Sequence, residues 1–205
     1  MLREIYKINV TLELLTGLYI GGTDNGFDIG GADSNVIKNP LDNIPYIPGS
    51  SVKGKLKYLL KIHEGKLNDE GNDYKFDDDN ITSLFEKAET KENQSTRAIF
   101  RDLTLSNKEF LESKLGKGRY TEIKGENKID PLKSTANPRF IERVPAGAIF
   151  KGEIIINVFD EDDKDTMIHA IEKALGLLEM NYLGGNGSRG YGRVKAEWKT
   201  EKVDI

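Results

Sequence analysis

The order in which hydrophobic periodicities follow one another along the chain is the feature that most restricts its fold. Residues 148–159 alternate between apolar and polar types, as in a strand with one buried face, and residues 162–182 carry apolar side chains at helical spacing. The patterned segments are a strand at 5–15, a helix beginning at 50–51, a strand at 97–105, a strand at 148–159, a helix at 162–182 and a strand at 193–199. This order predicts an α+β fold with a ferredoxin-like (RRM-like) β-α-β-β-α-β core, in which two helices cover one face of the sheet.

The segments outside this core predict one domain, residues 1–205, with two insertions. A chain of 205 residues has the length of a single domain that carries a sizeable insertion. The first insertion, at about 63–96, has a polar, acidic stretch and a short helical segment, and we expect a lid. The second, at about 116–145, has turn signals between two short extended patterns, which predicts a protruding thumb hairpin. A surface insertion without fixed structure is the alternative for the second segment.

Composition excludes several classes of protein. The chain has no cysteine, which rules out disulfides, thiol nucleophiles and thiolate zinc sites, and only His63 and His169 offer imidazoles. No apolar run approaches the ~18 residues of a membrane span, so we expect a cytoplasmic protein. The net charge is −4, but residues 47–61 carry four lysines and no acid, and residues 183–199 carry four cations and one acid. Such local basic segments predict a polyanionic partner in spite of the acidic total.

The second basic segment begins with a glycine-rich run, Leu183 to Arg193, which contains five glycines and two arginines. Gly185, Gly187 and Gly190 match the G-x-G-x-x-G spacing, but a dinucleotide-binding motif must follow a strand and open a helix. Here a helical pattern precedes the run and a strand pattern follows it, so we reject that function. Two interpretations stay open: a loop that contacts a nucleic-acid backbone, and a glycine turn that caps the preceding helix.

The first basic segment predicts a helix that begins after Pro48 and Gly49, with Ser50 or Ser51 as its N-cap. The apolar face consists of Val52, Leu56, Leu59 and Leu60, whereas Lys53, Lys57 and Lys61 lie on the opposite face with Lys55 at its flank. No acidic residue occupies the first turn. Free N–H groups beside lysines make this helix start a candidate anion site, although an ordinary solvated lysine face gives the same pattern.

A long loop at residues 16–48 contains six glycines between 17 and 31 and three aspartates, Asp24, Asp28 and Asp33. A loop of this length inside a small domain is usually functional or disordered, and its embedded apolar residues favour packing and function. Any of the aspartates can also act as a local turn-former. The residues alone therefore leave the role of Asp33 open.

Four stretches together resemble the RAMP superfamily of CRISPR effector proteins, and more narrowly the repeated backbone subunit of the type III-A (Csm) complex. They are Thr16-Gly-Leu-Tyr-Ile-Gly-Gly with Gly30-Gly-Ala-Asp-Ser, Tyr46-Ile-Pro-Gly-Ser-Ser-Val-Lys-Gly-Lys, Glu122 to Asp130 with Pro138 to Ala148, and Gly184 to Arg193. The likeness covers nearly the whole chain. It implies a subunit that binds a CRISPR RNA guide and cleaves target single-stranded RNA at regular intervals. The implied partners are other Csm subunits and copies of itself in a helical filament.

The resemblance also implies roles for individual residues. Asp33 corresponds to the catalytic aspartate. Guide-RNA contacts correspond to Ser50, Ser51, Lys53, Lys55, Arg143, Gly187, Ser188 and Arg189, and thumb residues to Glu122, Lys124, Glu126, Lys128 and Arg139. Relatives often have a histidine at the position of Tyr19, so imidazole assistance there is not expected in this chain. Some relatives bind zinc in the first insertion through cysteine and histidine; this chain has no cysteine, so we expect no zinc.

RNA cleavage without a protein nucleophile usually proceeds by attack of the substrate's own 2′-OH, which leaves 2′,3′-cyclic phosphate and 5′-OH ends. It requires in-line geometry, a proton acceptor and stabilisation of the developing charge. Asp33 could accept the proton or hold Mg²⁺ or Mn²⁺; since an unperturbed carboxylate is a weak base, with a pKa of ~4, metal positioning is at least as plausible.

Three alternatives remain. The first is a guide-binding filament subunit without cleavage activity. The second is a RAMP endonuclease that processes CRISPR RNA precursors, which usually uses histidine acid–base chemistry and ranks low with only His63 and His169 present. The third, an oxidoreductase that uses the glycine motif, ranks lowest because no strand precedes the glycines.

Overall fold

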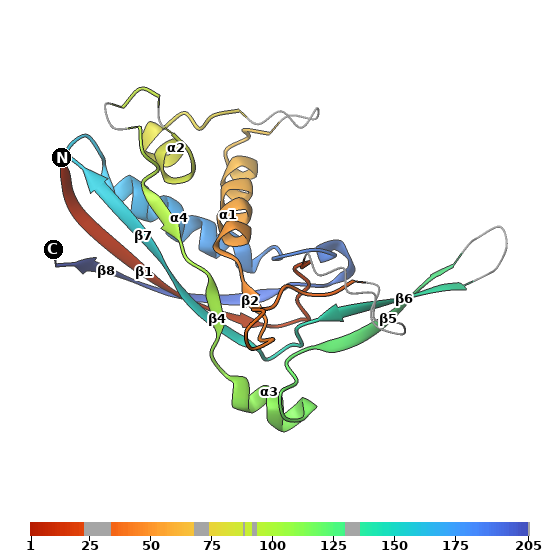
Figure 1. The fold of residues 1–205 in the computed structure, drawn as a ribbon. Helices are drawn as coiled ribbons and strands as arrows, with labels where there is room; N and C mark the ends of the chain where they lie inside the picture. Colours follow the sequence, from red (N-terminus) through yellow and green to blue (C-terminus); the bar gives the residue numbers. More distant parts are fainter. Residues whose placement is uncertain (23–33, 68–73, 88, 92–93, 130–135, 205) are drawn as a thin grey trace.

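The computed structural model describes residues 1–22, 34–67, 74–87, 89–91, 94–129 and 136–204. Within these ranges the chain forms a six-stranded antiparallel sheet, a separate two-stranded hairpin, and helices packed on one face of the sheet (Figure 1). No helix in this part of the chain is long and apolar enough to cross a membrane.

The sheet has the ferredoxin-like strand order that the sequence predicts. Its core strands are β1 (Leu2–Leu14), β3 (Ala98–Phe100) with β4 (Leu103–Leu105), β7 (Ile149–Phe159) and β8 (Val194–Val203). β1 pairs with β7 on one side and β8 on the other, while β3 and β4 pair with the far edge of β7. The short strand β2 (Tyr46–Ile47) extends the sheet beyond β4.

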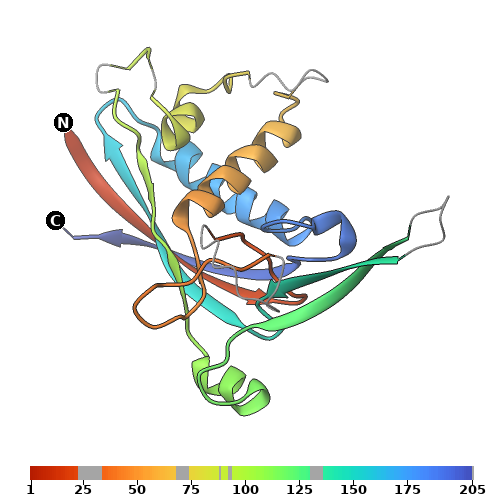
Figure 2. The same cartoon turned by 45° about the vertical axis from the view of Figure 1, so that its right-hand side comes forward.

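Two helices cover one face of this sheet, α1 (Gly49–His63) and α4 (Lys164–Glu179) (Figure 2). The even-numbered residues of β1 from Ile8 to Leu14 point into the core and are at most 2% exposed. The apolar face of α1 meets them as predicted. Burying side chains of this kind contributes about 1.5–3 kcal/mol each, which makes this layer the main stabilising element.

Several boundaries differ from the sequence-based prediction. Residues 97–105 form two strands rather than one, because the pairing with β7 shifts by one residue between Phe100, opposite Ile154, and Thr104, opposite Lys151. Between the two strands the Asp102 carboxylate accepts a hydrogen bond from the Gly49 N–H (2.7 Å). The last helix ends at Glu179, so Tyr182 lies in the following loop and not on the helix. Tyr182 continues the apolar spacing of the helix in the sequence, but it lies beyond the helix end and its ring packs against other parts of the molecule.

The first insertion contains a short helix, α2 (Asp79–Phe85), that packs against α4. A buried ion-pair network holds the chain that follows it: Arg97 donates to both carboxylate oxygens of Asp162, and Lys91 donates to the same carboxylate. Both the Arg97 and Asp162 side chains are fully buried. Burial alone would raise the pKa of Asp162, but the hydrogen bonds from Arg97 and Lys91 lower it below its usual value.

The second insertion is a hairpin, as predicted, and the alternative of an unstructured segment is wrong for the described residues. Its strands are β5 (Glu122–Ile129) and β6 (Ala136–Arg143), and a short helix, α3 (Lys108–Leu115), precedes them. The hairpin projects away from the body of the domain (Figures 1 and 2). One face carries the charged side chains of Glu122, Lys124 and Glu126, and the other carries the exposed apolar side chains of Ile123 and Phe140.

The antiparallel register brings three loops to one end of the sheet. β1 ends where β7 and β8 begin, with Glu13 opposite Ile149 and Leu14 opposite Val194. The glycine-containing loop after β1, the thumb before β7 and the glycine-rich loop before β8 therefore all leave the sheet at this end. Segments more than 100 residues apart in sequence become neighbours there.

We predict that Asp162→Asn destabilises the protein by about 3–5 kcal/mol, because it leaves Arg97 and Lys91 buried without their counter-charge. Urea unfolding followed by circular dichroism measures the change. Glu153→Gln is the matched control: it removes one partner of the exposed pair with Arg101 (2.9 Å) and should cost less than about 1 kcal/mol. Equal losses in the two variants would contradict the structural role of the network.

Candidate nucleic-acid interface

The glycine-rich loop, residues 183–193, lies against the segment that follows β1. The Gly192 N–H donates to the Gly17 carbonyl (2.9 Å), and the Gly185 N–H donates to the Tyr19 carbonyl (2.8 Å). These are main-chain contacts between residues more than 160 positions apart. They join two of the four stretches that carry the family resemblance.

Glycine is required here by close packing of the backbone. Gly192 has φ +70°, and a Cβ at this position would lie 1.9 Å from the Leu183 carbonyl oxygen. Gly184 has φ +74°, and its Cβ would lie 2.2 Å from the Tyr19 carbonyl oxygen. No L side chain fits either site. The alternative that these glycines cap α4 is wrong, because that helix ends at Glu179 with Met180 as its C-cap residue.

Tyr182, the residue directly before this loop, contacts Lys55 of α1. The Lys55 ammonium lies 3.8 Å from the centre of the Tyr182 ring, a cation–π contact, and burial lowers the pKa of Lys55. Gly187 packs against the same ring, since a Cβ there would lie 2.0 Å from the Tyr182 Cγ. The structure therefore brings the predicted residues Lys55, Gly187, Ser188 and Arg189 into one region, with Tyr182 between helix and loop.

The start of α1 differs from the prediction. Neither Ser50 nor Ser51 caps the helix: the N-cap residue is Pro48, which makes no side-chain capping bond. The first N–H, that of Gly49, is satisfied by Asp102 instead. A Cβ at Gly49 would lie 2.1 Å from the Phe100 carbonyl oxygen, so glycine lets the helix start approach the bend where Asp102 is placed. No acidic residue lies in the first turn, as expected.

The lysines of α1 do not form one solvated face. Lys61 is 2% exposed, lies over the Phe76 ring and donates to the Tyr74 carbonyl, so the prediction of a free surface lysine is wrong there. The first insertion covers this end of the helix, which the helical periodicity could not indicate. Lys57 pairs with Glu86 at 3.4 Å, whereas Lys53 is half-exposed in the first turns of the helix.

The two arginines predicted to contact RNA each lie beside a glutamate of the thumb. Arg143 forms a forked ion pair with Glu122, with both contacts at 2.7 Å, and Arg189 lies 3.4 Å from Glu126. Lys124 also contacts Glu126, at 3.1 Å. The predicted basic surface is therefore an arrangement of alternating charges in this structure. Arg139 is exposed on β6, and Lys128 belongs to β5, where its backbone pairs with Asn137.

A buried carboxylate, Glu142, joins the loop after β1 to the thumb. Its side chain accepts hydrogen bonds from the Val36 N–H (3.0 Å), the Thr121 hydroxyl (2.6 Å) and Lys38. Its own N–H donates to the Ser34 carbonyl (2.9 Å). Burial alone would raise the pKa of Glu142, but these hydrogen bonds lower it below its usual value.

Asp33, together with Asp24 and Asp28, lies outside the described residues. The next residue, Ser34, is held against β6 through a bridge to Ile141 as well as the bond to Glu142. Beside this point the thumb base has a cavity of about 660 Å³, whose cations are Lys38 and Arg119 and whose carboxylates are Glu122 and Glu142.

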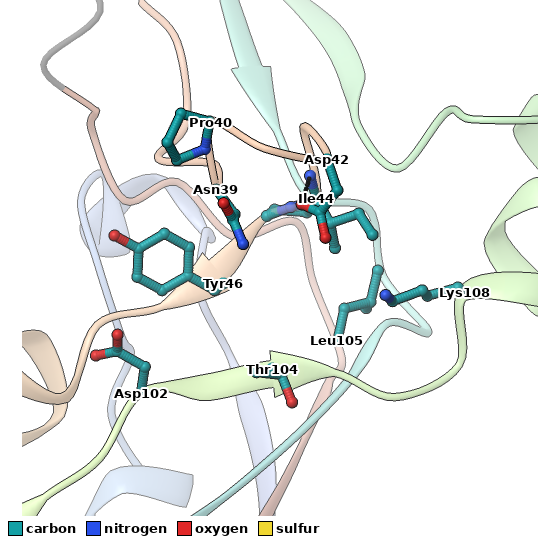
Figure 3. Close-up of a pocket in the computed structure, with 10 residues that line it drawn as sticks. Asn39, Pro40, Asp42, Ile44, Tyr46, Asp102, Thr104, Leu105 and Lys108 are labelled. Atoms are coloured by element: carbon teal, nitrogen blue, oxygen red, sulfur yellow. Dashed lines mark hydrogen bonds between the residues drawn. The ribbon is translucent and has the colours of Figure 1, made fainter.

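A further cavity of about 320 Å³ lies between β4 and the segment 39–46 (Figure 3). Tyr46 and Asp102 lie at one end and Lys108 at the other. With Asp42 and Asp102 against one lysine, its lining does not favour an anion. None of the residues that line this cavity is among the predicted binding residues, and its geometry does not indicate a binding site.

Sequence reasoning missed three residues that organise the interface: Tyr182, Tyr191 and Glu142 as a buried acceptor. Tyr191 is 1% exposed although it sits between two glycines. An aromatic residue flanked by glycines in a basic loop was a signal for an anchoring side chain. The partner of each residue lies far away in sequence, so no local pattern identifies it.

Comparisons with known proteins define the class to which the fold and this interface belong. The family model of the RAMP superfamily matches residues 11–195. A solved structure of a type III-B Cmr-β complex bound to cognate target RNA has a chain with TM-score 0.66 and 18% identity, covering 98% of this chain and 61% of that one. A Csm3–Csm4 subcomplex has TM-score 0.58 and 25% identity, covering 98% and 81%.

Curated relatives give the narrower assignment. A Streptococcus thermophilus protein named CRISPR system Cms endoribonuclease Csm3 is 45% identical over 194 residues, covering 93% of this chain and 86% of that protein. A Methanocaldococcus jannaschii protein of the same name is 41% identical over 192 residues, covering 90% and 75%. The chain therefore belongs to the RAMP superfamily and, within it, to the Csm3 family.

We predict that Gly187→Ala destabilises the protein by about 1–3 kcal/mol, because the added methyl group would overlap the Tyr182 ring. Gly176→Ala is the control, since nothing lies within 4 Å of its Cβ position in α4 and alanine favours the helix by about 0.5–1 kcal/mol. Thermal unfolding of both variants measures the effect. A Gly187→Ala variant as stable as the wild type would show that the loop does not depend on this contact.

Proposed function

We propose that this chain is a guide-RNA-binding backbone subunit of a type III-A CRISPR effector complex and an endoribonuclease that cuts guide-paired target RNA at regular intervals. Membership of the Csm3 family supports the general role, because curated relatives carry the name endoribonuclease. A structural neighbour is bound to target RNA, and another is a subcomplex with a Csm4 subunit. Assembly with other Csm subunits and with copies of this chain along the guide is part of the proposal.

One observation supports both activities in a single subunit. The start of α1, the glycine-rich loop and the thumb base meet at one end of the sheet, and Ser34 is bonded there to β6 (2.9 Å to the Glu142 N–H). Asp33 directly precedes Ser34. A guide held by α1 and the loop would present its paired target to the thumb beside the proposed catalytic residue.

In the proposed reaction the target supplies its own nucleophile. The 2′-OH attacks the adjacent phosphate, the bond to the 5′ oxygen of the next nucleotide breaks, and the products carry 2′,3′-cyclic phosphate and 5′-OH ends. The thumb would distort the target so that the attacking and leaving oxygens lie in line. Asp33 would take the proton from the 2′-OH, directly or through a water molecule, and the leaving 5′ oxygen would take up a proton from water. Lys38 and Arg119, which line the cavity at the thumb base, would stabilise charge on the phosphate.

A divalent metal ion, Mg²⁺ or Mn²⁺, is part of the proposal. Among the described residues no group of three or more His, Cys, Asp or Glu side chains could hold a metal. Glu142 is not available, because both of its oxygens accept hydrogen bonds from Val36, Thr121 and Lys38. In this proposal Asp33 and the RNA phosphate would hold the ion, which suits Mg²⁺ because it keeps several waters and binds through one or two carboxylates and phosphates. When bound, it would stabilise negative charge on the phosphate.

Three other functions are weaker. A subunit that only binds the guide is disfavoured because the curated relatives carry the name endoribonuclease. A precursor-processing enzyme usually needs histidine chemistry, but His63 is exposed on the last turn of α1 and His169 lies within α4, both away from the thumb base. The dinucleotide-binding alternative lacks a strand before the glycines, since α4 precedes them.

We predict that Asp33→Ala in an assembled complex abolishes the regularly spaced cuts while target binding stays within about twofold of the wild type. Removal of divalent metal with EDTA should have the same effect on cutting. Gel analysis of labelled target RNA measures the cuts, and filter binding measures affinity. Persistent cutting by Asp33→Ala would show that the catalytic assignment is wrong and favour another carboxylate.

We predict that substitutions of Arg189 and Glu126, which form one ion pair, change guide affinity in opposite directions. Arg189→Ala should weaken RNA binding and reduce the slope of log affinity against log salt by about 0.7, the contribution of one phosphate contact on a single strand. Glu126→Gln should strengthen binding by about two- to fivefold, because it removes the competing charge from Arg189.

Glu197→Gln is the matched control for this pair of variants. It also removes an exposed glutamate that pairs with a cation, Lys195 at 2.7 Å, but on β8 and away from the thumb. Equal gains for Glu126→Gln and Glu197→Gln would indicate a general charge effect and contradict the local competition.

A further inference from the structure

Tyr191 is the most buried large side chain of the glycine-rich loop. It is 1% exposed, although its neighbours Arg189 and Gly190 are exposed. Burial and the hydrogen bond to Glu126 raise the pKa of Tyr191 to about 12, so the phenol keeps its proton at neutral pH. A buried, protonated tyrosine beside the exposed residues 188–190 is an anchor that donates one hydrogen bond.

Both thumb strands contact this one side chain. The Tyr191 hydroxyl donates to Glu126 of β5 (2.8 Å). The Lys124 ammonium lies 4.6 Å and the Arg143 guanidinium 5.0 Å from the centre of the ring. Arg143 belongs to β6, so the ring contacts the hairpin through both of its strands.

These contacts add a second point of attachment to a projecting hairpin. The first point is the thumb base, where Glu142 bonds to Ser34 and Val144 pairs with Leu18. β5 has 8 residues, roughly 26 Å at about 3.3 Å per residue, and Glu126 lies four residues from its start. A hairpin attached at one point can pivot, whereas attachment at two points determines its direction.

The hydrogen bond from Tyr191 to Glu126 is suited to holding the hairpin while RNA is bound. Arg189 also reaches Glu126, but this exposed cation is a proposed phosphate contact and would turn toward bound RNA. The Tyr191 side chain is 1% exposed, so a bound RNA would not reach its hydroxyl as it would reach Arg189. The tether would therefore persist when the guide is bound.

We infer that Tyr191 is a positioning residue: its bond to Glu126 sets the direction of the thumb relative to the guide-binding loop and so selects which target phosphate is cut. The attachment of the thumb stands on the geometry alone, whereas the selection of the phosphate rests on the proposed function. A displacement of about 1 Å at a reacting centre can cost about a hundredfold in rate, so a loosely held thumb would lose rate and accuracy.

The first test measures the tether in the isolated full-length chain by hydrogen exchange of the β5 amides. Tyr191→Phe should speed this exchange by about fivefold, the factor that corresponds to one hydrogen bond of ordinary net strength. Glu126→Leu should do the same, whereas Glu126→Gln should stay near the wild type, because its amide oxygen still accepts from Tyr191. Rescue by glutamine separates the hydrogen bond from the charge.

Tyr120→Phe is the matched control, because Tyr120 also donates its hydroxyl to a glutamate, Glu112 at 2.6 Å, but next to α3. Its β5 exchange should match the wild type at positions 124–127. Unchanged exchange in Tyr191→Phe, or an equal increase in Tyr120→Phe, would overturn the inference.

The second test uses the assembled complex. Tyr191→Phe should keep target affinity within about twofold but cut about tenfold more slowly, with cuts at neighbouring phosphates. Tyr6→Phe, which removes a hydroxyl-to-glutamate bond on β1 (Tyr6 to Glu4, 2.7 Å), should cut as the wild type does. Wild-type rates and positions in Tyr191→Phe would overturn the positioning role. Cutting that persists in Asp33→Ala would instead refute the proposed catalytic residue, and the exchange measurement would still decide the tether.

Discussion

The antiparallel pairing of β1 with both β7 and β8 is the constraint on which the rest of the molecule depends. It aligns the end of β1 with the starts of the other two strands. The loop after β1, the thumb and the glycine-rich loop therefore leave the sheet at the same end. Buried side chains on the covered face make any other register costly, because a one-residue shift would turn the apolar set of β1 toward solvent. The proposed site is thus a consequence of sheet register.

Close backbone approach is what the glycines of the loop provide in this structure. Gly184 and Gly192 leave room for the main chain at Tyr19 and Leu183, and Gly187 leaves room for the Tyr182 ring. The loop is therefore a packed element from which Arg189 projects. A packed loop can hold a phosphate contact in a fixed place, which a flexible one could do only with loss of conformational entropy.

Charge at the interface is balanced before any RNA binds. Glu122 pairs with Arg143, and Glu126 pairs with Arg189. The Asp102 carboxylate accepts a hydrogen bond from the first N–H of α1. On guide binding, the arginines would exchange their carboxylate partners for RNA phosphates. The free energy of binding would then be the difference between the new ion pairs with RNA and the ion pairs within the protein. This balance agrees with the net charge of −4; in the proposed filament, RNA affinity would come from repetition of the subunit along the guide.

The sequence by itself determined the core and the thumb, because the alternation in residues 5–15 and 148–159 and the spacing of Val52, Leu56 and Leu59 state directly which faces are buried. It also brought Asp33, Lys55 and Arg189 forward as candidates. Only the tertiary structure decided what covers each face: that Lys61 is buried, that Asp102 caps α1 in place of Ser50, and that Tyr191 holds Glu126. The physical reason is that periodicity reports the geometry of one element, whereas the partners of Lys61, Gly49 and Tyr191 lie 13, 53 and 65 residues away on other segments, which only tertiary packing brings close.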